Sequence, residues 1–251
     1  MSRGSSVTAL AAYVLHRYDW SESSLIVDLF TRELGRVVVA AKGAKRPTSQ
    51  LRAVLRPFQR LQATLGRTTP GAEVHNLRGA DWAGGVPVAS GDALFSGFYL
   101  NELLMKLLAR EDPHPALWDA YAATLGLLGG TDESAALRAF ELRLLREIGV
   151  LPDLARITAT QSPLRPAAQY ALRAEAGVAP LPVTEAAGIT GTDLLAMQAA
   201  LNGGDDLPAL QRACVGSAAA LRRQLRELLA YHLGPTPLHT RQVLLDLQPL
   251  L

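Results

Sequence analysis

The chain has little cysteine and little charge. Cys214 is the single cysteine of the 251 residues, which excludes an internal disulfide framework, a cysteine-ligated zinc module and an iron–sulfur cluster. Only 19% of the residues are charged while 49% are hydrophobic, so the chain can bury a core and is not a disordered segment. A lone cysteine is also typical of a protein from a reducing compartment.

Long hydrophobic runs are missing as well. Every apolar stretch is interrupted by charge, glycine or proline before it reaches the ~20 residues that a membrane-spanning helix needs. Residues 1–10 (MSRGSSVTAL) lack the apolar segment of a secretory signal. We therefore expect a soluble, cytoplasmic protein.

Recognisable catalytic motifs do not occur. The sequence has no phosphate-binding loop, no GxGxxG, no HExxH and no GxSxG, and its five histidines are scattered. A cluster of nearby acids could hold Mg²⁺ for nuclease chemistry, but ion pairing with neighbouring arginines is the favoured interpretation; these acids are Asp19, Glu22, Asp28 and Glu33. The sequence predicts a protein that is not an enzyme and that carries no metal or other cofactor.

Charge is distributed unevenly along the chain. Residues 1–80 carry twelve Lys and Arg against five Asp and Glu, whereas residues 81–251 carry thirteen against eighteen. The first segment is therefore strongly basic and the remainder mildly acidic. Such a division is typical of a basic module that meets a polyanion, joined to a part with another task.

The basic segment has the pattern of short strands. Five runs rich in β-branched and aromatic residues are separated by turn residues, at 8–15, 24–31, 36–41, 58–65 and 73–77. Five short strands without a long helix predict a small barrel of the OB type, and an SH3-like barrel is the alternative that the pattern leaves open.

Helical periodicity begins at Asp92. Helices are expected from there to before Pro113, over 116–128 and over about 131–149, and these should pack as a bundle. Five prolines make residues 150–190 a loop-rich subdomain, and helices resume at 192–201, 215–233 and 238–247. The predicted fold is therefore α+β and multidomain: an OB-type barrel at 1–80, helices at 81–149, the loop-rich insertion at 150–190 and helices at 191–251.

The strongest local feature is residues 40–56 (AAKGAKRPTSQLRAVLR), which contain five cations and no acid. Gly43 and Pro47 indicate a loop that projects these side chains from the barrel, as phosphate binding requires. Aromatic residues that could stack on bases are also present, although most are expected in the core; they are Tyr13, Tyr18, Trp20, Phe30 and Phe58. With flanking cations included, the candidate nucleic-acid-binding residues are Arg32, Arg36, Lys42, Lys45, Arg46, Arg52, Arg56 and Arg60.

Several segments, in this order, resemble the RecO family of bacterial recombinational repair proteins of the RecF pathway. In the barrel they are 18–24 (YDWSESS), 29–35 (LFTRELG) and 41–47 (AKGAKRP). In the helical part they are 98–104 (FYLNELL), 111–117 (EDPHPAL), 137–141 (LRAFE), 231–234 (YHLG) and 238–241 (LHTR). The resemblance covers essentially the whole chain.

The resemblance implies a non-enzymatic mediator of DNA repair, associated with the nucleoid. Proteins of this family bind single- and double-stranded DNA, anneal complementary strands, contact the acidic, apolar tail of single-strand-binding protein and, with RecR, help to load RecA. An acidic tail needs cations beside an apolar groove, and two helical segments offer them: Arg138, Arg143 and Arg146, or Arg222, Arg223 and Arg226. An RNA-binding OB module with a helical interaction domain is the competing interpretation.

The sequence departs from the family at one position. Many members carry a four-cysteine zinc finger in the region of 150–190, where this chain has Ile157 and Thr160 at the expected spacing and no cysteine near 179–183. A structural zinc site needs four good ligands. We therefore predict that this subdomain folds without metal, held by apolar contacts of residues such as Leu154, Ile157, Leu164, Leu172, Leu181 and Val183.

Overall fold

The structure is a computed structural model that describes residues 9–66, 71–85, 91–182, 184–185, 187–204, 206–235, 238–240 and 242–243. The chain divides into two compact units, Met1–Trp118 and Asp119–Leu251. Each unit has its own buried core.

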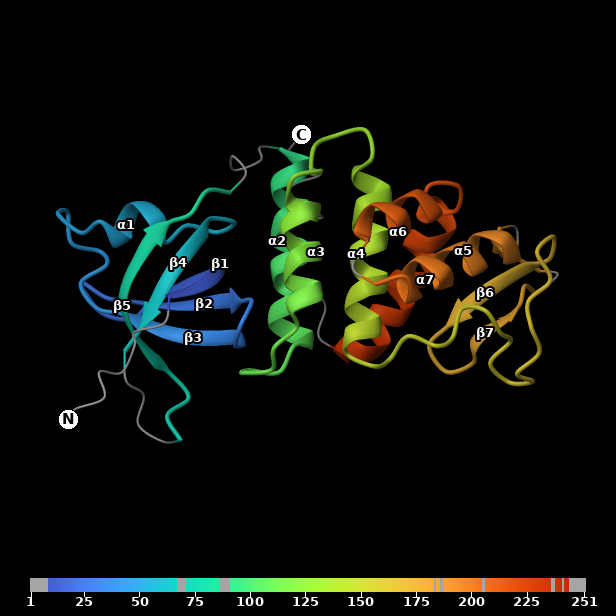
Figure 1. The fold of residues 1–251 in the computed structure, drawn as a ribbon, viewed down its shortest axis with the longest axis horizontal. Helices are drawn as coiled ribbons and strands as arrows, with labels where there is room; N and C mark the ends of the chain where they lie inside the picture. The colour runs from blue at the N-terminus through green and yellow to red at the C-terminus, as the bar shows by residue number, and fades with distance from the viewer. Residues whose placement is uncertain are drawn as a thin grey trace. The chain divides into compact units, whose positions relative to one another are not determined.

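Five strands of the first unit close into a barrel (Figure 1). They are β1 (Ala9–Asp19), β2 (Leu25–Thr31), β3 (Gly35–Ala41), β4 (Arg60–Leu65) and β5 (His75–Trp82). The strand order is β1-β2-β3-β5-β4, with β1 also paired to β4 and with β3 and β5 parallel. This closed five-stranded order confirms the OB-type barrel and removes the SH3-like alternative.

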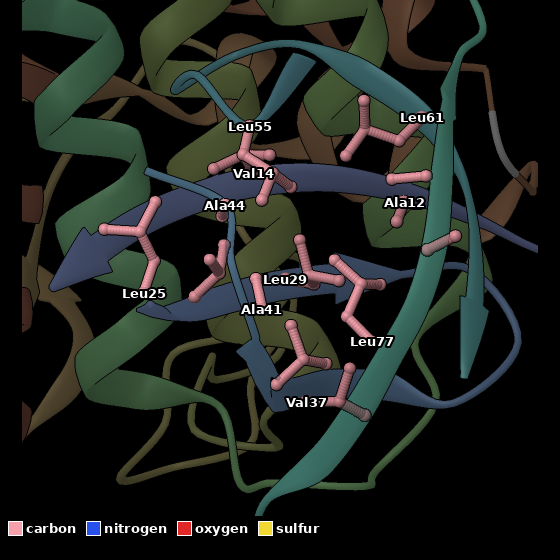
Figure 2. Close-up of a cluster of buried hydrophobic side chains, with 14 residues drawn as sticks. Ala12, Val14, Leu25, Leu29, Val37, Ala41, Ala44, Leu55, Leu61 and Leu77 are labelled. Atoms are coloured by element: carbon pink, nitrogen blue, oxygen red, sulfur yellow. The ribbon is translucent and has the colours of Figure 1, made fainter. Parts of the chain in front are cut away.

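Alternating apolar residues fill the barrel, because successive side chains of a strand point to opposite faces. Val37, Val39 and Ala41 of β3 share one buried cluster with Val27 and Leu29 of β2. Figure 2 shows side chains of this cluster converging on the barrel interior. The five strands that were expected from the apolar runs between turn residues are therefore present, with β1 and β5 longer than predicted.

The connection between β3 and β4 closes one end of the barrel. It contains one short helix, α1 (Leu51–Val54), which the sequence did not predict. Ala44 and Leu55 are fully buried in the barrel cluster (Figure 2). Leu51 and Val54 are partly buried and pack against this cluster. Apolar burial on the order of 25 cal/mol per Å² therefore holds this segment on the barrel.

Helix α2 (Asp92–Leu107) belongs to the first unit and contacts the outer surface of the barrel. Asn101 Nδ2 donates to the carbonyl of Leu15 over 2.7 Å. Farther along the chain, the indole of Trp118 is buried against Tyr13 and donates to the carbonyl of Phe30 over 3.0 Å. These contacts cover part of the outer face of β1 and β2.

The second unit combines helices with a small sheet. Helix α3 (Pro115–Leu125) crosses into it, and α4 (Glu133–Glu147) packs against α6 (Leu207–Cys214) and α7 (Ala218–Leu233). A three-stranded sheet has the order β7-β6-β8, formed by β6 (Gln169–Arg173), β7 (Gly177–Pro180) and β8 (Ile189–Thr190). Helix α5 (Gly191–Asn202) follows the last strand directly.

Two features of this unit differ from the sequence expectation. The residues 150–190 contain the sheet rather than loops alone, with Leu154, Leu164 and Leu172 buried as predicted. Helix α6 was not predicted; the side chain of Asp206 caps it by accepting from the backbone N–H of Ala209. Val183 and most of the helix expected at 238–247 lie outside the described residues.

Within the described part of the chain, no helix is both long and apolar enough to cross a bilayer.

Candidate nucleic-acid interface

The segment between β3 and β4 separates apolar from cationic side chains. Its apolar residues turn into the barrel, whereas Lys42, Arg46, Arg52 and Arg56 are exposed. Arg52 lies on α1 and Arg56 follows it, and both are exposed while Leu51, Val54 and Leu55 pack on the barrel. We call the four exposed cations together with Lys45 the cationic cap.

The cap is tied to the loop between β1 and β2. Lys45 Nζ lies 3.2 Å from Asp19 Oδ1 and donates to the carbonyl of Ser21 over 2.9 Å. The backbone N–H of Lys45 donates to Ser23 O over 2.9 Å. One of the five cap cations therefore serves mainly to join two loops, and the join fixes the β1–β2 loop beside the other cations.

The four exposed cap cations have no acidic counterpart among the described residues. No carboxylate in that part of the chain forms an ion pair with Lys42, Arg46, Arg52 or Arg56. An exposed surface with several uncompensated positive charges attracts phosphate groups and releases their counterions when it binds them.

Arg36 lies apart from the cap. Its Nε donates to Asp28 Oδ1 over 2.9 Å, and the guanidinium also donates to the carbonyls of Met105 and Leu108 at the end of α2. Asp28 is almost completely buried. Arg36 therefore fastens the barrel to the segment that carries α2, and we leave it out of the proposed surface.

Arg32 and Arg60 are also separated from the cap. Arg32 is exposed in the β2–β3 hairpin, at the end of β2 opposite to Leu25, and a seven-residue strand spans roughly 20 Å. The guanidinium carbon of Arg60 lies 5.2 Å from the ring centre of Trp118, a cation–π contact. Of the eight predicted residues, the structure therefore brings together Lys42, Lys45, Arg46, Arg52 and Arg56.

Two further residues lie near the cap: Arg17, which was not named from the sequence, and Trp20, which was named there as a possible stacking residue. Arg17 is exposed at the end of β1, and its NH1 donates to the carbonyl of Leu55, next to Arg56. Trp20, which was grouped with aromatic residues expected mostly in the core, is 70% exposed. Tyr13, Phe30 and Phe58 are buried as expected.

Tyr18, near the end of β1, is also an exposed aromatic residue, but it has different neighbours. Its ring stacks edge-on against His16, with centres 4.5 Å apart. Burial of the phenol, with a further contribution from the Asp28 carboxylate, raises the pKa of Tyr18, and Arg36 and Arg110 partly oppose this. Tyr18 therefore stays a neutral side chain in the ordinary pH range.

The acids that were considered as magnesium ligands are dispersed. Asp19 pairs with Lys45, Asp28 pairs with Arg36, and the carboxylate of Glu33 accepts from the backbone N–H of Ala11. The expected pairing with an arginine is thus confirmed for Asp28, whereas Asp19 pairs with a lysine instead. No group of three or more His, Cys, Asp or Glu side chains in the described ranges is arranged to hold a metal ion.

The two arginine sets of the helical unit have different environments. Arg138 and Arg143 are buried; Arg138 NH2 lies 2.6 Å from Glu141 Oε1, and Arg143 donates to the carbonyl of Gly204. Arg138 and Arg143 therefore cannot form the open surface that the α4 alternative required, whereas Arg146 is exposed. Arg222 and Arg226, one turn apart on α7, are exposed.

Comparison with known proteins covers both units. Residues 6–85 match the family described as "Recombination protein O N terminal", and residues 89–242 match "Recombination protein O C terminal". A protein named DNA repair protein RecO from Polaromonas naphthalenivorans is 52% identical over 242 residues, which cover 95% of this chain and 96% of that protein. Proteins of the same name from Paracidovorax citrulli (51% identity, 95% and 96% covered) and Variovorax paradoxus (48% identity, 100% of both chains) are similarly close. The chain, with its barrel unit and its helical unit, therefore belongs to the RecO family.

Proposed function

We propose that this chain is a recombination mediator that binds DNA and performs no catalytic step. It holds single- and double-stranded DNA on the cationic cap and anneals complementary strands. With RecR, it helps to load RecA onto single strands that are covered by single-strand-binding protein.

The observation that carries the proposal is the division of the β3–β4 segment into an apolar inner side and a cationic outer side. Two DNA strands repel each other through their phosphates, and annealing requires that this repulsion be screened while the base edges stay accessible. Lysine and arginine contacts to phosphates position a strand without reading its sequence. A surface of this kind can therefore promote pairing between any complementary strands.

The face of the barrel where OB domains commonly bind ligands is buried in this chain, which leaves the cap as the exposed alternative. OB domains commonly bind ligands on the outer face of strands 2 and 3 and on the flanking loops. Here Phe30 and Val38, on that face, are buried, and Arg36 is engaged by Asp28. The β1–β2 loop and the cap stay exposed, so we assign the DNA surface to them.

The helical unit offers a surface for a protein partner. Arg222 and Arg226 on α7 are exposed, and Tyr231, one turn and a residue beyond, is 56% exposed. An acidic tail would be recognised by cations of this kind. With 3.6 residues per turn, Tyr231 lies roughly 140° around the helix from Arg226 and is not part of the same face. We propose that the tail of single-strand-binding protein binds the face of α7 that carries Arg222 and Arg226. We assign no residues to the binding of RecR.

Strand annealing tests the proposal. Complementary DNA oligonucleotides should pair faster with the full chain than alone, both bare and covered by single-strand-binding protein. Replacing Lys42, Arg46 and Arg52 by alanine should remove most of the acceleration on both substrates. The Arg222→Ala/Arg226→Ala variant should lose the acceleration only on strands that are covered by single-strand-binding protein.

A matched control removes three exposed arginines of the second unit, Arg146, Arg165 and Arg212, and should anneal like the unaltered chain. Equal annealing by the cap variant and this control would contradict the proposal. Acceleration that is confined to RNA oligonucleotides would instead support the RNA-binding interpretation.

A further inference from the structure

Trp20 is exposed although its side chain is among the largest apolar ones. It follows β1 directly, and 70% of the residue is accessible to solvent. The loop around it is closed by backbone hydrogen bonds from Trp20 N and Ser21 N to Ser24 O, and Ser24 N donates to Ser21 Oγ. The indole is therefore held outward by a short, bonded turn.

The cationic cap lies next to this indole. Lys45 Nζ contacts Asp19 and Ser21, the residues on either side of Trp20. Gly43 N donates to Ser24 Oγ at the other end of the loop, between the exposed Lys42 and the rest of the cap. The loop that carries Trp20 is thus bonded directly to the segment that carries the exposed cations.

The other two tryptophans differ from Trp20. Trp118 is buried, and its indole N–H donates to a backbone carbonyl. Trp82 is 64% exposed, but its indole N–H donates to Gln59 Oε1 over 3.1 Å and it lies on β5. In the part of the chain that is described, no side chain accepts a hydrogen bond from Trp20 or stacks on it.

We propose that Trp20 is a stacking platform for one base of a single strand whose phosphates lie on Lys42 and Arg46. Every base has an aromatic face, so stacking adds affinity without sequence preference. In a duplex the bases are already stacked and paired, so the platform favours single strands over double strands. The inference rests on the proposed function and adds base contact to a surface otherwise defined by charge.

The experiment compares three ligands with the full chain: a thymidine oligonucleotide, an abasic strand of equal length and a duplex. Trp20→Ala should weaken binding of the thymidine strand by roughly five- to hundredfold, the range for loss of one stacked base. Binding of the abasic strand and the duplex should stay within about twofold, and the salt dependence should not change, because no cation is removed. Trp20→Phe should restore most of the affinity.

Trp82→Ala is the matched control, as an exposed tryptophan of the same unit, and should bind all three ligands like the unaltered chain. Intrinsic fluorescence gives an independent readout: quenching by the thymidine strand should persist in Trp82→Phe and disappear in Trp20→Phe. Equal weakening on all three ligands, or none on any, would overturn the inference. If Trp20→Ala weakened binding only to a peptide of the acidic tail of single-strand-binding protein, the surface would belong to a protein partner. That result would also overturn the inference.

Failure of this inference differs from failure of the proposed function. If the cap variant loses annealing while Trp20→Ala binds normally, charge alone holds the strand. If the cap variant anneals normally, the proposed function itself is contradicted, whatever Trp20 does.

Discussion

At the scale of single residues, the arginines of the barrel unit differ in what their guanidinium groups contact. Arg52 and Arg56 face solvent, Arg60 lies over Trp118, and Arg36 is bound to Asp28 and two carbonyls. Because these arginines are close in the sequence, they were predicted to form one basic patch. Their separation depends on Met105, Leu108 and Trp118, which are distant in the chain, and no local pattern predicts such contacts.

Arg36 should therefore affect stability rather than DNA binding. Arg36→Met leaves the buried Asp28 carboxylate without its partner, and loss of one partner of a buried pair costs about 3 kcal/mol or more. Urea unfolding measures this cost. Arg78→Met, at an exposed arginine on β5, should change the free energy of unfolding by less than about 0.5 kcal/mol. A cost for Arg36→Met that matches Arg78→Met would show that the pair contributes little.

Cys214 should be unreactive in the folded chain. Burial, with a further contribution from Glu141, raises the pKa of its thiol from 9.0 to about 12. The folded thiol thus stays protonated where the unfolded one ionises, so this group makes stability fall as pH rises from near 9.0 towards about 12. At pH 8 a disulfide reagent should label the protein only after denaturant is added; rapid labelling of native protein would contradict the burial.

At the scale of elements, the strands follow from short apolar runs between turn residues, and the long helices follow from their helical periodicity. The loop–α1 connection and α6 do not, since each is short. Yet α6 has a readable signal: Asp206 precedes a proline, and the buried Leu207, Leu210 and Cys214 follow at helical spacing. The exposure of Trp20 had no such signal, because an aromatic residue at a strand end fits a core equally well.

Gly35 should be intolerant of any side chain. It adopts φ +70° in the β2–β3 hairpin, and an added Cβ would overlap the backbone carbonyl of Asp112. Gly35→Ala therefore combines backbone strain with a clash against main chain, and we expect a loss of several kcal/mol in the free energy of unfolding, on the order of 3.

Gly71→Ala provides the control for this prediction. Gly71 has φ +83° but nothing lies within 4 Å of the added Cβ, so the substitution carries only the conformational cost of about 1 kcal/mol. Similar unfolding energies for the two variants, measured in urea, would show that the Asp112 backbone yields easily.

The subdomain at 150–190 should keep its fold without metal. Thr158, between the two positions of the missing cysteine pair, accepts a hydrogen bond at Oγ1 from Val178 N, and its own N–H donates to Val178 O. Hydrogen bonds and buried leucines thus join the segments that four metal ligands would join. A chelator should leave thermal unfolding unchanged; stoichiometric zinc in the purified protein, with unfolding on its removal, would contradict this.

At the scale of the whole molecule, residues 1–80 are basic and the remainder of the chain is mildly acidic. The barrel unit carries the cationic cap, and the helical unit has exposed arginines on α7. The charge division was visible in the sequence, and so was the family. Which five of the eight candidate cations share one surface became clear only from the fold.

The salt dependence of single-strand binding tests the cap most directly. If about five phosphates are neutralised, the logarithm of the binding constant should fall with the logarithm of salt concentration at a slope near −3.5. In the Lys42→Ala/Arg46→Ala/Arg52→Ala variant the slope should become shallower by about 2, since each lost contact removes roughly 0.7. The Arg146→Ala/Arg165→Ala/Arg212→Ala control should keep the original slope. An unchanged slope in the cap variant would contradict the account.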